Sequence, residues 1–172
     1  MDGAGDVAAS HHAVLTRRQA AESNLHPRAI RRDKAVGTVR EVGRGTLIVH
    51  GSLDTLQQRM LIAVNAGPPG TTISFRSGAF LHRVDGIIDP PVEVTVGRGR
   101  RVRVEGVIVH RVSVPLDSRD IVVVDGIPCT SLARTLVDLP HVVGDDVVER
   151  ALDDSQPSIP YGHPPRGRGR AA

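Results

Sequence analysis

The chain has 172 residues and a net charge of +3, which is enough length for one ordinary domain or two small ones. Apolar residues make up 40% and aromatic residues 2%, so any core must consist mainly of valine, leucine, isoleucine and alanine. No apolar run approaches the roughly 18–20 residues of a membrane span, no signal peptide is recognisable, and Cys129 stands alone, so the composition predicts a cytoplasmic protein without disulfides.

The positive charge is carried almost wholly by arginine, because Lys34 is the only lysine among 22 basic residues. The planar guanidinium group suits phosphate binding, but a GC-rich genome also produces an arginine-rich composition. The total charge is therefore not evidence that the protein binds nucleic acid. The distribution of basic residues over the fold is the more informative property.

Three short helices are predicted near the N-terminus. The first covers about residues 6–12. Thr16 followed by Gln19 is a capping box, in which the two side chains satisfy free amides at the start of a helix over about 16–23. The proline that opens the segment 27–36 suits the first turn of the third helix.

A β-hairpin is predicted directly after these helices. The β-prone runs "TVREV" and "TLIVH" flank the glycine-containing turn "GRG". Helices joined by tight turns and followed by a hairpin predict a winged helix-turn-helix over residues 1–51. In that arrangement the helix 27–36 is the recognition helix and the hairpin is the wing.

The helix 27–36 has a basic side and an apolar side when successive residues are placed about 100° apart. Ala29, Ile30 and Val36 fall on the apolar side, with Asp33 among them. A recognition helix needs basic residues for phosphates and base edges, whereas the solvated face of a structural module has the same composition. The predicted DNA-binding residues, on this helix and beside it, are Arg17, Arg18, Arg28, Arg31, Arg32, Lys34, Arg40 and Arg44.

A second unit, a small α+β domain, is predicted over residues 52–155, so the fold class is α+β. Its first helix is predicted to be capped by Asp54, with Gln57 at the spacing of the first capping box. A second helix lies in "TTISFRSGAFLHRV", capped by Thr72 or Ser74. Two more helices are predicted in "SLARTLVDL", where the serine is the cap, and in "DDVVERALDD".

The strands of this unit are predicted as two hairpins. "PVEVTV" alternates with its valines on one face, which predicts that Glu93 points to solvent. "VIVHRV" returns after the turn "GRGRR", as the second arm of a β-hairpin. Asp125 and Gly126 form a strong hairpin dipeptide between "IVVV" and "IPCT".

The order and spacing of several motifs over residues 14–155 resemble the AbiEi-type antitoxin family of actinobacteria. The motifs are "VLTRRQA", "RAIRR", "EVGRGTLIVHG", "VEVTVGRGRR", "VVVDGIPCTSLARTLVDL" and "ERALDD". The resemblance implies the antitoxin of a type IV toxin–antitoxin system, with an N-terminal winged helix-turn-helix. Such a protein is expected to bind its own promoter DNA and to oppose a nucleotidyltransferase toxin.

The chain departs from that family at three places. Asp33 stands where relatives have an apolar residue, and Phe75 replaces the histidine of their usual Ser-His-Arg. Many relatives continue into a nuclease-like domain, whereas this chain leaves the pattern at Ser155 and ends in a proline- and glycine-rich stretch, 156–172, predicted to be disordered. A protein-interaction module, or a truncated remnant without independent activity, therefore stays open beside a DNA-binding regulator.

No catalytic or metal-binding pattern is complete. Asp89 and Glu93 lack the lysine of a magnesium nuclease, since Thr95 stands at that position. "GSLDT" is not followed by the paired aspartates of nucleotidyl transfer, and the histidines lack metal-ligand spacing. Cys129 is expected to be a buried, inert thiol and His82 a residue at the edge of the core. The sequence therefore predicts a protein that is not an enzyme and uses no cofactor or metal.

Overall fold

The computed structural model describes residue 8 and the ranges 12–43, 45–100, 102, 104–114 and 116–155. The predicted first helix, apart from Ala8, and the predicted disordered stretch 156–172 lie outside the described residues. The α+β class is confirmed, because helices accompany two separate sheets. None of the described helices is long and apolar enough to cross a bilayer.

The chain forms a smaller N-terminal part and then a larger part. The N-terminal part comprises β1 (Val14–Thr16), α2 (Arg17–Glu22), α3 (Pro27–Ala35), β2 (Val39–Gly43) and β3 (Thr46–Val49). The larger part comprises α4 (Leu56–Ala66), β4 (Thr72–Ile73), α5 (Phe75–Leu81), β5 (Val92–Gly97), β6 (Val107–Val112), β7 (Ile121–Val124), β8 (Ile127–Thr130), α6 (Leu132–Asp138), the 3-10 turn η1 (Leu139–His141) and α7 (Asp145–Ser155).

Local sequence signals account for α2 and for the hairpin beside it. The capping box is confirmed, because the Thr16 side chain accepts a hydrogen bond from the amide of Gln19 and the Gln19 side chain accepts one from the amide of Thr16. The predicted hairpin is also confirmed, with β2 antiparallel to β3. A strand that was not predicted, β1, pairs with the other side of β3 and completes a three-stranded sheet.

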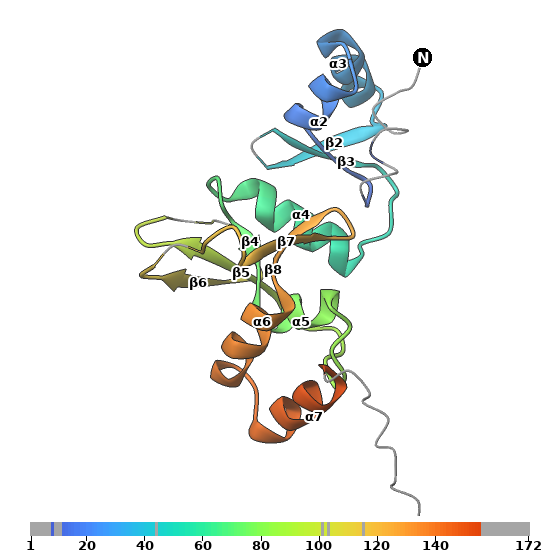
Figure 1. Cartoon of the computed structure of the whole chain (residues 1–172). Coiled ribbons are helices and arrows are strands. Elements are labelled where there is room, and N and C mark those ends of the chain that lie inside the picture. The colour runs from blue at the N-terminus through green and yellow to red at the C-terminus, as the bar shows by residue number, and fades with distance from the viewer. Residues whose placement is uncertain are drawn as a thin grey trace, which may run out of the picture.

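Helix α4 lies between the two sheets (Figure 1). One core contains Val14 and Ile48 of the first sheet, Leu56 and Met60 of α4, and Ile73 of the second sheet. The prediction that Asp54 caps this helix was wrong by one residue: the Thr55 side chain accepts a hydrogen bond from the amide of Gln58 at 3.1 Å. The Gln58 side chain in turn donates to the Ser52 hydroxyl and to the carbonyl of His12, which ties the start of α4 to the N-terminal part.

The five-stranded sheet has the order β6-β5-β4-β8-β7. The predicted hairpin around Asp125 and Gly126 is confirmed, since β7 and β8 are antiparallel and both turn residues have positive φ. The other predicted hairpin was wrong: β5 and β6 are parallel, with Val92 beside Val107 and Gly97 beside Val112. The glycine-rich turn after β5 does form, since the amide of Arg100 donates to the Gly97 carbonyl, but β6 begins beside Val92, at the opposite end of β5.

Glu93 is fully buried, which corrects the prediction that it points to solvent. Its carboxylate accepts hydrogen bonds from the amide and guanidinium of Arg76, at 2.8 to 3.1 Å, and lies 3.1 Å from His110 Nε2. The hydrogen bond to Glu93 raises the pKa of Arg76. Alternation along β5 failed as a guide because α4 covers one face of the strand and α5 covers the other.

Replacing Glu93 with glutamine should lower the free energy of unfolding by about 3 kcal/mol, because it leaves the Arg76 charge without its buried counter-ion. Urea denaturation measures this loss. Asp146→Asn is the matched control, since the Arg150–Asp146 pair on α7 is exposed and such pairs contribute about 0–1 kcal/mol. Equal losses in the two variants would contradict the structural role given to Glu93.

Cys129 lies in β8 with no exposed surface, as the sequence predicted for a buried thiol. Burial raises its pKa to about 12, so almost none of the thiolate exists at neutral pH. The folded protein should therefore react with a thiol reagent at pH 8 orders of magnitude more slowly than the urea-unfolded chain. A free cysteine reacting at the same rate in both states would show that β8 is not buried.

Candidate nucleic-acid interface

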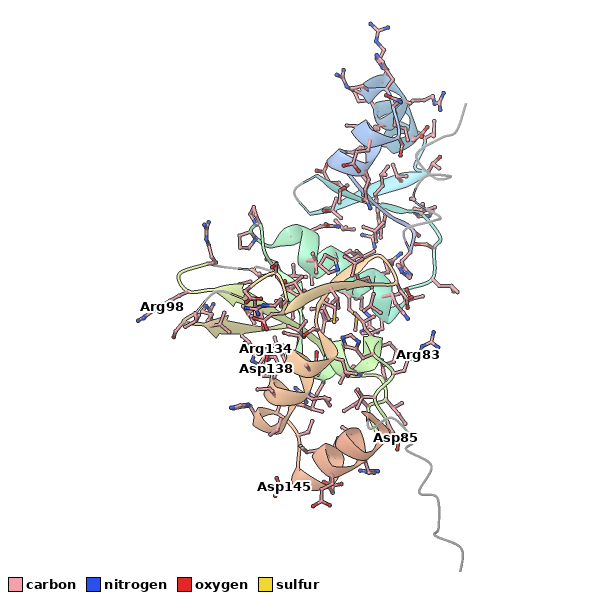
Figure 2. The ribbon with its side chains drawn as sticks, in the orientation of Figure 1. Arg83, Asp85, Arg98, Arg134, Asp138 and Asp145 are labelled. Carbon is pink, nitrogen blue, oxygen red and sulfur yellow. The ribbon has the colours of Figure 1, made fainter. Side chains whose placement is uncertain are left out.

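Helix α3 carries an exposed basic side and a side that packs on the protein. Arg28, Arg31, Arg32 and Lys34 are all exposed and together form the α3 surface. Figure 2 shows nitrogen-tipped side chains projecting away from α3 at one end of the molecule. On the other side, Ala29 and Ile30 pack against a core that includes Leu15, Ala20, Leu25, Val39 and Leu47.

Two of the basic residues already have carboxylate partners. The Arg32 guanidinium donates to Asp33 at 3.1 Å, and Lys34 Nζ donates to Glu41 of β2 at 2.6 Å. Within the part of the chain that the structure describes, the side chains of Arg28 and Arg31 make no ion pair. These two guanidinium groups are therefore the charges of the α3 surface that are most available to an anionic ligand.

Asp33 lies on the inner side of α3, and only 5% of its surface is exposed. Arg32 supplies its counter-charge from the exposed side, which makes a carboxylate tolerable where an apolar residue was expected.

The prediction that Val36 faces inward was wrong, since 69% of its surface is exposed. The reason is that α3 ends at Ala35, so Val36 is the C-terminal cap and no longer follows the helical period.

Glu41 connects α3 to the hairpin, a role that the sequence reasoning missed. One oxygen of its carboxylate accepts from Lys34, and the other accepts from the amide of Gly45 in the hairpin turn at 3.2 Å. A recess of about 500 Å³ separates these elements and is bordered by Ile30, Arg31 and Gly45, among others. No spacing rule relates Lys34 to Glu41, because their contact depends on how the hairpin folds back on the helix.

The remaining predicted residues are not all brought to this surface. Arg17 and Arg18 lie in the first turn of α2, and Arg44 lies outside the described residues. Arg40 is exposed on β2, but it pairs with Ile48, which belongs to the core around α4. Residues paired across two antiparallel strands point to the same face of the sheet. Arg40 therefore points, with Ile48, to the face of the first sheet that packs on α4, which is opposite α3.

Comparisons with known proteins give little further information. No protein-family model matches the chain, and no curated protein matches it. One similar solved structure is the RV2827C protein from Mycobacterium tuberculosis, with 17% sequence identity and a TM-score of 0.44. The similarity covers 90% of this chain and 70% of that chain, and at this level it supports no conclusion about function.

Proposed function

We propose that the protein is a DNA-binding transcriptional regulator and that β1, α2, α3 and the β2–β3 hairpin serve as a winged helix-turn-helix. Helix α3 is the recognition helix of this proposal, and the hairpin is its wing. One observation carries the proposal above all: Arg28 and Arg31 are exposed and unpaired, among the described residues, on the side of α3 opposite to the core-packed Ala29 and Ile30.

The residues of the α3 surface have unequal roles in this proposal. Arg28 and Arg31 reach phosphates or guanine edges in the major groove without giving up another partner. Arg32 and Lys34 must first exchange Asp33 and Glu41 for the nucleic acid, so each contributes less. Arg17, Arg18 and Arg44 are assigned to the phosphate backbone, and Arg40 is not part of the same surface.

Arg31→Ala should weaken binding to the promoter upstream of the protein's own gene. The slope of log K against log salt should fall by about 0.9 if Arg31 contacts one phosphate, because fewer counterions are released. Lys34→Ala should change the slope less, since Glu41 already neutralises that ammonium. Gel shifts or fluorescence anisotropy at several salt concentrations measure both quantities.

Arg83→Ala is the matched control for this experiment. Arg83 is exposed and makes no ion pair among the described residues, but it lies beyond α5, away from α3 (Figure 2). Its removal takes the same charge from a surface that the proposal does not use. An affinity that falls equally in Arg31→Ala and Arg83→Ala would exclude α3 as the recognition helix.

We further propose, from the sequence resemblance, that the regulator is a cytoplasmic antitoxin of a type IV toxin–antitoxin system. Residues 52–155 are then the part that opposes a nucleotidyltransferase-like toxin. The neighbouring reading frame is expected to encode such a toxin, and co-expression with the chain should restore growth. Arg31→Ala should keep this protection while losing promoter binding.

A chain that protects against or captures the toxin but binds no promoter DNA at low salt would support the interaction-module alternative. In that case the N-terminal part is a scaffold and the α3 surface a solvated face. A wild-type chain that melts without a cooperative transition would instead support the truncated-remnant alternative.

A further inference from the structure

A second group of arginines gathers where β5 and β6 end. Arg98 and Arg100 flank Gly99 in the turn after β5, where the amide of Arg100 donates to the Gly97 carbonyl at 3.1 Å. Gly99 has φ +77°, a conformation that allows so tight a turn. Arg111 lies at the same end, because the parallel register places it beside Val96 of β5. Arg98, Arg100 and Arg111 are exposed and together form the β5–β6 arginine cluster.

Among the described residues, these three arginines have no carboxylate partner, whereas six others do. Elsewhere in the described ranges the guanidinium groups of Arg32, Arg59, Arg76, Arg119, Arg134 and Arg150 lie within 4.0 Å of an acidic side chain. Figure 2 shows one such pair, Arg134 beside Asp138, and shows Arg98 projecting away from the body of the protein. Among the described residues, arginines without an ion pair occur on α3 and β2, at Arg83, and in the β5–β6 arginine cluster.

The surroundings of the cluster suit a phosphate group. A recess of about 380 Å³ lies beside Arg98 and Arg100, and it is lined by the small residues Gly70, Gly97 and Ser113 and by apolar residues that include Val96, Leu116 and Ile121. Small residues let a ligand approach the backbone closely, and the guanidinium fork matches two phosphate oxygens. Two of the three arginines lie on a turn and Arg111 lies near the end of the edge strand β6. Because no helix carries these charges, the cluster suits contacts with the phosphate backbone rather than base recognition.

The cluster and the α3 surface cannot share the same few phosphates. Helix α4 and the first sheet separate them (Figure 1). We propose that the β5–β6 arginine cluster binds the phosphodiester backbone of duplex DNA flanking the segment that α3 contacts. This inference rests on the proposed function, because it gives one protein molecule two separate contacts with one duplex.

The test compares wild type with the double variant Arg98→Ala/Arg100→Ala on two duplexes. The short duplex contains only the segment that the double variant still shields from nuclease, and the long duplex extends it on both sides. On the long duplex the salt slope should fall by about 0.9 for each phosphate that the variant no longer binds. On the short duplex the affinity and slope should stay at their wild-type values. The melting temperature of the variant protein should equal that of wild type.

Arg83→Ala is again the control and should match wild type on both duplexes. An unchanged slope for the double variant on the long duplex would overturn the inference, and so would an equal loss on both duplexes. The two proposals fail separately. If Arg31→Ala weakens binding and the double variant does not, the regulator stands and the second contact falls. If only the double variant weakens binding, α3 is not the recognition helix and the cluster is the main contact.

Discussion

The arrangement of the described part of the chain depends on the burial of α4 between two sheets. With almost no aromatic residues, the core must be filled by aliphatic side chains that touch each other closely. Met60 and Ala63 of α4 have no exposed surface, and the core around them draws residues from both sheets. Full burial of one large apolar side chain such as methionine contributes about 1.5–3 kcal/mol. The packing of α4 therefore stabilises the contact between the first sheet, on which α3 packs, and the second sheet.

The arginines of the protein divide by their partners rather than by their position in the sequence. Arg76 is bound to a buried carboxylate and anchors α5 to β5, and Arg134 is bound to Asp138 within α6. Such residues contribute to the fold, and their charge is already neutralised by a carboxylate, so they attract a ligand weakly. The guanidinium groups that have no ion pair among the described residues are not neutralised by a neighbouring carboxylate. Long-range attraction of a polyanion depends on these groups.

Most local chemistry was predictable from the sequence, although the cap of α4 is Thr55 and not Asp54, whereas pairing between distant segments was not predictable. The capping box at Thr16, the cap at Ser131 and the hairpin turn at Asp125 each depend on residues within a few positions of one another. The parallel pairing of β5 with β6 depends on where the chain re-enters the sheet, which no turn motif specifies. Alternation in β5 correctly indicated an apolar face and a polar face. It could not show that the polar face is also buried, because this burial depends on α5 and on Arg76, which covers Glu93.

The candidate interface was predictable to a similar extent. The helical period placed Arg28 and Arg31 on the side opposite Ala29 and Ile30 without knowledge of the fold. It could not show that Lys34 is engaged by Glu41 of a later strand, or that Arg40 points to the other face of its sheet. Both depend on how the hairpin packs against the helix, which is a property of the folded chain.

The position of α4 also affects how the chain behaves when its backbone is cut. The segment 51–55 joins β3 to α4 at the surface, and 82% of Leu53 is exposed there. A protease that cleaves this connection leaves Val14 and Ile48 packed on Leu56 and Met60. Because the same apolar contacts hold the two fragments, we expect them to copurify and to separate only in denaturant.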